Sequence, residues 1–230
     1  MSAGDLPLAS PTPSPPMPPM ILALDTATTS GAAWGNVGTQ PQWTAFTAKG
    51  ASLGAKLWRF RAWLNSVIDE TNPTLIVYES RYLPVGRQPR VVRAGTAVGV
   101  APAGTPPINI DVLKLLLGID GEVHEVAFGR VIELREATSA EFIAYFTGKA
   151  RHGGRAAKKA ATIAACDRMG WVTESDDVAD ALALWAFAEH KVAPEIAARR
   201  MAGAGVELGL RGTLDRPVQT RIGRREVDDD

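Results

Sequence analysis

A short acidic segment near the end of the chain could carry out chemistry: SDDVAD at 175–180, directly before the apolar run ALALWAFA. That run can bury a helix on almost every side, so its first turn would carry the carboxylates towards the protein interior. Asp177 and Asp180 are three residues apart and share a helix face. Buried carboxylates repel one another, and a divalent cation between this pair and other acids would remove the repulsion. The simpler alternative is an acidic first turn that caps the helix and complements its dipole.

Two more acids end apolar runs earlier in the chain. The run MILALD ends on Asp25, and the run LIVYES contains Glu79. Ligand sites of open α/β sheets form outside strand ends, so one place could collect these two acids with Asp177 and Asp180. Four oxygen donors without Cys or a nearby His suit Mg²⁺ or Mn²⁺ rather than zinc. Two such ions roughly 4 Å apart hydrolyse phosphodiesters, one activating water and the other stabilising the leaving oxygen.

The hydrophobic pattern predicts the elements that position these acids. Predicted strands span 20–25, 29–37, 42–48, 74–80 and 131–135. Predicted helices span 53–71, 110–128, 139–147, 156–169 and 177–191. This order predicts an α/β fold with a mixed five-stranded sheet flanked by helices on both faces.

Length and composition predict one folded domain between two extensions. Residues 1–20 hold seven of the sixteen prolines and read as a disordered leader. The domain is expected over 21–192, and 193–230 is a Gly/Arg-rich, partly mobile extension. Cys166 is the only cysteine, which excludes a disulfide framework, and it reads as a small core residue. No apolar run could span a bilayer and no signal-peptide pattern is present, so a cytoplasmic location is expected.

The charge balance restricts any nucleic-acid surface to local clusters, because 25 basic and 25 acidic residues cancel. One acid-free basic run follows the third predicted helix, and a Pro-, Gly- and Arg-rich loop at 81–108 holds a second. The candidate phosphate contacts are Arg81, Arg87, Arg90, Arg93, Arg151, Arg155, Lys158 and Lys159. Five tryptophans are expected in the core rather than on a base-stacking surface: Trp34, Trp58, Trp63, Trp171 and Trp185.

Four motifs resemble RuvC-type Holliday junction resolvases of the RNase H-like superfamily, in particular phage and prophage forms. They are ILALDTATTSGAAWG, LIVYES, LLLGIDGEVHEVAFGRVIEL and DDVADALALWAFA, and the resemblance covers about 20–190. It implies an RNase H-like fold and a homodimeric crossover junction endodeoxyribonuclease that cuts Holliday junctions and other branched DNA with two Mg²⁺ (or Mn²⁺) ions.

The resemblance also implies roles for individual residues. Asp25, Glu79, Asp177 and Asp180 match the catalytic metal ligands, because the family places its last two acids three apart immediately before Ala-Leu. That register makes Asp176 a neighbour of the site rather than a ligand. The family has an aromatic residue that enters the junction three positions after its Glu, and Tyr82 occupies the matching place.

A second resemblance leaves an alternative open. The stretch DTATTSG also resembles the first phosphate loop of actin-like ATPases and of related proteins that assist tRNA threonylcarbamoylation. In such a protein Thr26, Thr28, Thr29 and Ser30 would face phosphate or a partner. Glu79 and the Asp177/Asp180 pair would then have no assigned role.

Overall fold

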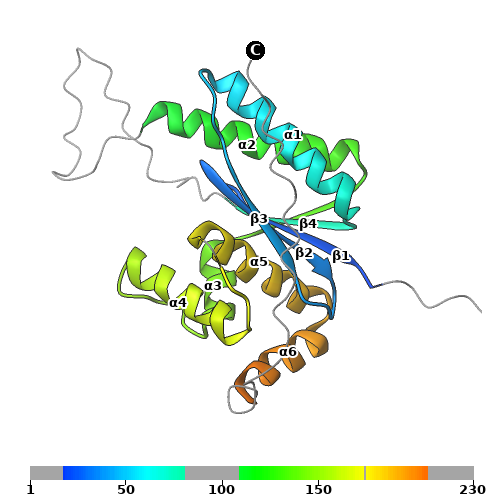
Figure 1. The fold of residues 1–230 in the computed structure, drawn as a ribbon, viewed down its shortest axis with the longest axis vertical. Helices are drawn as coiled ribbons and strands as arrows, with labels where there is room; N and C mark the ends of the chain where they lie inside the picture. The colour runs from blue at the N-terminus through cyan, green and yellow to red at the C-terminus, as the bar shows by residue number, and fades with distance from the viewer. Residues whose placement is uncertain (1–17, 81–108, 174, 207–230) are drawn as a thin grey trace, which may run out of the picture.

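A mixed sheet forms the centre of the protein in the computed structural model, which describes residues 18–80, 109–173 and 175–206 (Figure 1). Its strands are β1 (Met20–Asp25), β2 (Thr29–Asn36), β3 (Gln42–Thr47), β4 (Leu75–Glu79) and β5 (Glu133–Ala137), in the order β3-β2-β1-β4-β5. The first three strands pair antiparallel, whereas β4 pairs parallel with both β1 and β5. The mixed five-stranded sheet predicted from the sequence is confirmed.

Helices cover both faces of the sheet. They are α1 (Leu53–Thr71), α2 (Ile110–Gly129), α3 (Ser139–Thr147), α4 (Arg155–Arg168), α5 (Asp176–Val192) and α6 (Pro194–Val206). Figure 1 shows α1 and α2 on one side of the sheet and α5 on the other, with α3, α4 and α6 beyond it. Alternation along β1 divides the core accordingly, because Leu22 and Leu24 pack towards α1 and α2 while Ile21 and Ala23 pack towards α5.

Two predicted positions are wrong. The last strand starts at Glu133 rather than Val131, because Val131 has a φ of +56° and a 93 % exposed side chain in the turn after α2. Trp58 is 64 % exposed rather than in the core, because its neighbour Leu57 is the residue of α1 that contacts Gly118 of α2. Trp34, Trp171 and Trp185 are buried, and Trp63 is partly buried against the core.

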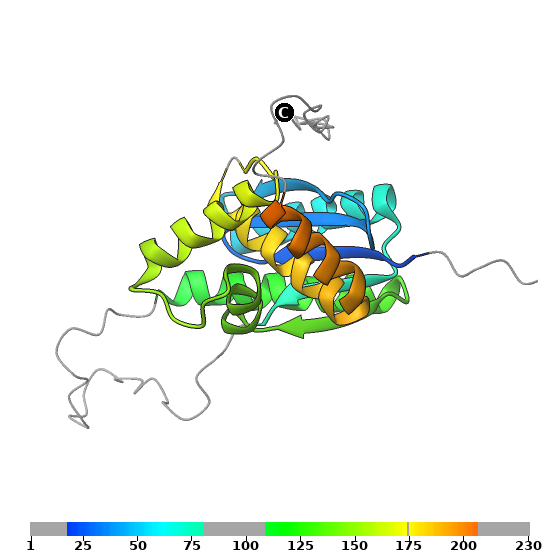
Figure 2. The ribbon, with the colours of Figure 1, turned by 90° about the horizontal axis from the view of Figure 1, so that it is seen from below.

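Helix α6 was not predicted from the sequence, although it lies within the range expected to be an extension. Figure 2 shows it beside α5. Glu189 of α5 is fully buried and accepts hydrogen bonds from Arg200 Nε (2.7 Å), Arg200 Nη2 (2.9 Å) and Gly38 N (2.8 Å). This ion pair attaches α6 to α5 and to the turn after β2. No helix in the described ranges combines the length and apolar character of a membrane span.

Candidate active site

The first two predicted ligands end neighbouring parallel strands. Asp25 is the last residue of β1 and Glu79 the last of β4, one step beyond the pair Leu24 and Tyr78. Leu24 and Tyr78 belong to the core under α1 and α2, so strand alternation turns both acids towards α5. The carboxyl groups of Asp25 and Glu79 share a hydrogen bond.

The other two predicted ligands lie at the start of α5. Ser175 caps this helix by accepting a hydrogen bond from Val178 N at 3.3 Å. Apart from Asp180, which is half-buried, residues 178–189 are buried, so the sequence holds the helix tightly against β1 and β2. Asp177 and Asp180 are close enough to Asp25 for their charges to act on it, so the three elements bring all four predicted acids to one edge of the sheet.

Gly31 permits this arrangement, and the sequence analysis did not identify it. It pairs with Asp25 across β1 and β2. A Cβ atom at this position would lie 2.1 Å from the carbonyl oxygen of Asp177 and 2.7 Å from its carbonyl carbon. Only a glycine therefore lets the start of α5 come this close to the end of β1. A glycine inside a strand often marks such a close approach of another backbone, which is the signal that was available.

Burial and mutual repulsion shift the site towards protonation. Asp25 is 6 % exposed, and burial, the hydrogen bond with Glu79 and the charges of Glu79, Asp180 and Asp177 raise its pKa well above the usual value. Burial also raises the pKa of Asp180, against the opposing effect of Lys158, and that of Asp177, against Lys159 and Arg155. Within the described residues, one buried oxygen of Asp180, Oδ1, has no hydrogen-bond partner. The nearby cations therefore do not offset the burial and mutual repulsion of these carboxylates.

Basic side chains of α4 lie next to the four predicted acids. Lys158 Nζ lies 3.9 Å from Asp180 Oδ2 and donates a hydrogen bond to Ser139 Oγ. Lys159 forms an ion pair with Asp176. Asp176 thus already has a cationic partner, in keeping with its predicted role as a neighbour rather than a ligand, which stays a prediction.

Known proteins share the fold but not the sequence. Neither the models of protein families nor the curated proteins include one that matches the sequence. The structure of T. thermophilus RuvC in complex with a Holliday junction substrate matches with a TM-score of 0.50 and 13 % sequence identity, over 77 % of this chain and 96 % of that one. The chain has a RuvC-like fold. Two further matches have TM-scores of 0.48: RuvC of Thermus thermophilus (13 % identity, 81 % and 96 % covered) and the yeast mitochondrial Holliday junction resolvase Ydc2 (11 %, 84 % and 86 %).

The ligand atoms of the four predicted acids in this RuvC-like fold suit a hard divalent cation. The four predicted ligands offer only carboxylate oxygens, and Asp180 Oδ1 is an acceptor that no donor in the described part of the chain satisfies. Across the described part of the chain, however, no three acidic, His or Cys side chains stand in an arrangement that already encloses an ion. An ion bound between Asp25 and Glu79 would replace the hydrogen bond that their carboxyl groups share.

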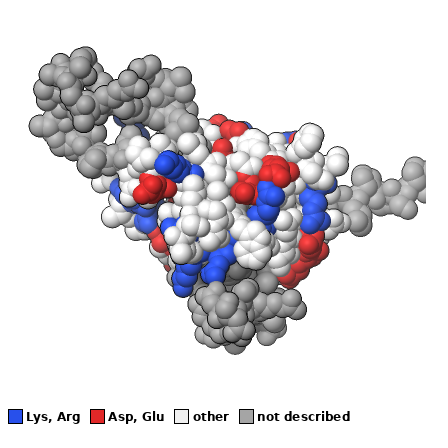
Figure 3. Space-filling model, turned by 90° about the horizontal axis from the view of Figure 1, so that it is seen from above, with Lys and Arg blue, Asp and Glu red and all other residues white. Residues whose placement is uncertain are grey.

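The predicted DNA contacts of the RuvC-like domain divide into two groups. Arg81, Tyr82, Arg87, Arg90 and Arg93 lie outside the described residues. Arg151 and Arg155 are exposed before and at the start of α4, and Lys158 and Lys159 are partly exposed one turn later. Figure 3 shows Lys and Arg interspersed with Asp and Glu on the face drawn there, as expected for a chain without net charge.

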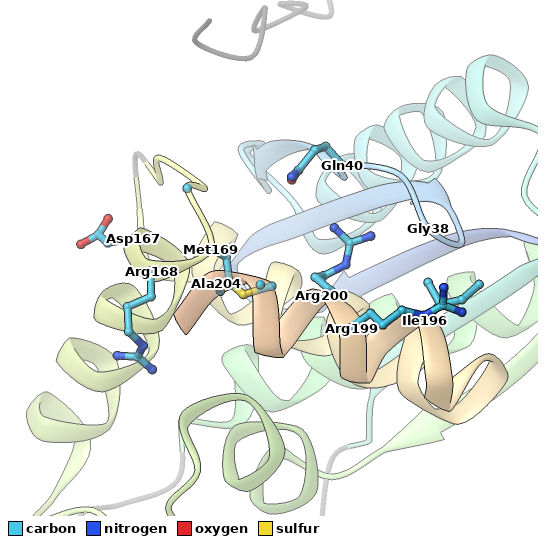
Figure 4. Close-up of a pocket in the computed structure, with 11 residues that line it drawn as sticks. Gly38, Gln40, Asp167, Arg168, Met169, Ile196, Arg199, Arg200 and Ala204 are labelled. Atoms are coloured by element: carbon cyan, nitrogen blue, oxygen red, sulfur yellow. The ribbon is translucent and has the colours of Figure 1, made fainter. Parts of the chain in front are cut away.

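A cavity of about 750 Å³ lies away from the four acids. It is bounded by α6, the end of α4 and the turn between β2 and β3, and Arg168, Arg199 and Arg200 are among its lining residues (Figure 4). Glu189, at the opposite end of α5 from Asp177, fixes Arg200 in place. The cavity therefore belongs to the other end of the sheet and does not extend the acidic site.

The raised pKa of Asp25 predicts how the stability of the metal-free protein depends on pH. A carboxyl group whose pKa is higher in the folded state keeps its proton longer there, so stability is lost as pH rises from about 4 through the raised pKa. Denaturant unfolding in EDTA should show that Asp25→Asn gains stability over wild type as pH rises through this window. A difference between the two proteins that does not change with pH would contradict the proton assignment.

Proposed function

We propose that the protein is a divalent-metal-dependent endonuclease that cuts Holliday junctions and related branched DNA. The observation that supports this most strongly is the meeting of four carboxylates where β1 and β4 end and α5 begins, in a RuvC-like fold. A structural cap would account for acids at the start of α5, but not for Asp25 held 6 % exposed beside Glu79 with a strongly raised pKa. Acids kept in such mutual repulsion indicate a site whose ligand supplies positive charge.

Asp25, Glu79, Asp177 and Asp180 would hold two Mg²⁺ or Mn²⁺ ions. Ions in such a site activate a water molecule and stabilise the leaving oxygen of a phosphodiester. The chain supplies rigid placement: β1 and β4 fix two ligands through the sheet, and the buried helix α5 fixes the other two. Lys158 lies 3.9 Å from Asp180 Oδ2 on the side of α4, and Asp180 Oδ1, which has no hydrogen-bond partner among the described residues, can accept a ligand.

The start of α4 supports binding of DNA phosphates next to the acids. Its cap residue Gly154 makes no side-chain capping bond, and its first turn holds Arg155 and no acid. Cations are unfavourable at a helix N-terminus, so they are better explained by an anionic partner than by helix stability. Arg151, Lys158 and Lys159 extend the same basic run. A four-way junction presents two equivalent strands, so a two-fold symmetric homodimer is the fitting assembly.

The actin-like alternative agrees less well with the geometry. Ser30 is buried, donates a hydrogen bond to Ala27 O (3.0 Å) and accepts one from Ala27 N (3.2 Å). It therefore closes the turn between β1 and β2 instead of facing a phosphate. That reading also leaves Glu79 and the Asp177/Asp180 pair unexplained.

A cleavage assay with a matched set of substrates tests the proposal. Labelled four-way junction, duplex of the same sequence and RNA/DNA hybrid are incubated with the protein in Mg²⁺ or in EDTA. Cutting of the junction alone, and only with Mg²⁺, is expected. In parallel, Mg²⁺ should raise the melting temperature by binding the folded state, and ATP should add nothing further. Absence of junction cutting, or a stabilisation specific to ATP that survives Asp177→Ala, would overturn the proposal.

The basic run predicts a change in salt dependence. Replacing Arg151 and Arg155 together with Ala should weaken junction binding and flatten its dependence on salt, because each phosphate contact contributes about 0.9 to the log-log slope on duplex DNA. Binding is measured in EDTA across a salt series. Lys114→Ala is the matched control, since Lys114 is exposed on α2 across the sheet from α4. Equal slopes for the double variant and wild type would assign these arginines to solvent.

A further inference from the structure

A carboxylate on the edge strand holds both neighbours of Glu79. Glu136 of β5 accepts a hydrogen bond from Tyr78 Oη at 2.6 Å through one oxygen and from Ser80 Oγ at 2.9 Å through the other. Tyr78 and Ser80 flank Glu79, and strand alternation puts them on the face opposite its side chain. One side chain of β5 thus bridges the two residues between which Glu79 stands.

Tyr78 is itself firmly held. Its side chain is 1 % exposed, and its hydroxyl lies 2.7 Å from Nε2 of His124 on α2. The hydroxyl has a single proton, which it donates to Glu136, so Nε2 of His124 must be the donor in the second bond. The Tyr78 and Ser80 hydrogen bonds also hold the pKa of the Glu136 carboxyl below its usual range, so Glu136 is a stable anion in this network.

The backbone of Glu79 is tied to the same strand. Glu79 pairs with Ala137, and Ser80 N donates a hydrogen bond to Ala137 O at 2.9 Å. The backbone hydrogen bonds between β4 and β5 fix the register of Glu79 in the sheet. Through its bonds to Tyr78 and Ser80, Glu136 also resists twisting of the end of β4. Beyond Ser80 the chain leaves the described residues, so this contact is made at the last described residue of the segment.

We infer that Glu136 is a positioning residue for Glu79: it sets the direction in which the Glu79 carboxylate meets the metal, without contacting the metal itself. The inference rests on the proposed function. The network adds little to folding, because Glu136 is about half exposed and its bonds lie at the sheet edge. Partners that orient a metal ligand, in contrast, typically change metal affinity by about 10–100-fold when they are lost.

The test measures metal dependence separately from DNA binding and folding. Glu136→Ala should raise the Mg²⁺ concentration for half-maximal junction cutting by about tenfold. Its junction affinity in EDTA and its melting temperature in EDTA should stay close to wild type. The Mg²⁺-induced rise in melting temperature, which is independent of cutting, should need a correspondingly higher Mg²⁺ concentration.

Further variants separate positioning from a general loss of structure. Glu136→Gln keeps one acceptor and the shape of the side chain, so it should recover part of the metal affinity. Ser80→Ala removes one of the two hydrogen bonds to Glu136, at a residue that is less buried than Tyr78. It should also raise the Mg²⁺ concentration for half-maximal cutting. Glu133→Ala is the control, because Glu133 lies on the same strand and is paired with the neighbouring Arg135.

The outcomes distinguish this inference from the proposed function. One outcome is that wild type cuts junctions normally with Mg²⁺ while Glu136→Ala and Ser80→Ala need the same Mg²⁺ concentration for half-maximal cutting as wild type. That result would overturn the positioning role and leave the nuclease proposal intact. A lower melting temperature in EDTA with an unchanged Mg²⁺ midpoint would assign Glu136 to folding and also overturn it. If wild type neither cuts junctions nor responds to Mg²⁺, both proposals are wrong.

Discussion

Replacing Asp180 with Asn is expected to lower Mg²⁺-dependent junction cutting by about 10³-fold or more while leaving junction binding nearly intact. The substitution removes one charged ligand, and metal coordination contributes several kcal/mol to transition-state stabilisation. Asp180 is the sharpest choice because its Oδ1 is buried where α4 meets α5 and has no hydrogen-bond partner in the described structure. Single-turnover cutting and binding in EDTA measure the two effects separately.

The same substitution should not destabilise the metal-free protein. Burial raises the pKa of Asp180 and outweighs the opposing effect of Lys158, and the charges of Glu79 and Asp177 raise it further, so a neutral Asn removes a charge that is unfavourable on balance. An unchanged or higher melting temperature in EDTA, together with lost cutting, would exclude misfolding as the cause. Asp25→Asn, Glu79→Gln and Asp177→Asn should behave in the same way.

Asp176→Asn is the matched control for this series. It makes the same chemical change on the same helical turn, but Asp176 is paired with Lys159 on the α4 side. We expect it to retain most of the activity. Full Mg²⁺-dependent turnover by the Asp180→Asn protein, or equal losses in the Asp176 and Asp180 variants, would refute the four-ligand assignment.

Gly31→Ala is expected to damage both folding and cutting, although Gly31 has no functional group. The new methyl group would meet the backbone of Asp177 at 2.1 Å from its carbonyl oxygen, and a backbone cannot rotate away as a side chain can. Overpacking of this kind costs about 1–3 kcal/mol in the free energy of unfolding. The start of α5 must shift away from Asp25, and a displacement of about 1 Å can lower a catalysed rate about 100-fold.

Gly121→Ala provides the comparison for this change. Gly121 lies in α2, and nothing in the described structure lies within 4 Å of a Cβ built there. Alanine favours a helix over glycine by up to about 1 kcal/mol, so this variant should be slightly more stable and fully active. Denaturant unfolding and cutting of both variants test the argument. A Gly31→Ala protein with wild-type activity would show that the approach of α5 to β2 does not position Asp177.

Local pattern in the sequence determined the elements that hold the candidate site. Alternation and helical spacing depend only on near neighbours, so β1, β2 and β4 and the start of α5 appear within about two residues of their predicted bounds. The four acids were identifiable because each stands at the end of such an element, where the parallel pairing of β1 and β4 brings strand ends together. The resemblance to RuvC-type resolvases then predicted the fold, which is confirmed.

Only the tertiary structure decided which groups support those acids. The contact of Gly31 with Asp177 joins residues 146 positions apart, and the Tyr78 bond to Glu136 spans 58 positions. Long-range packing also decided that Trp58 is exposed and that α6 packs on α5 through Arg200 and Glu189. Such contacts depend on which surfaces meet when distant segments pack, and a short window of sequence carries no information about that meeting. Residue type and spacing therefore showed what the site is made of, and packing decided how closely its parts approach and what holds them there.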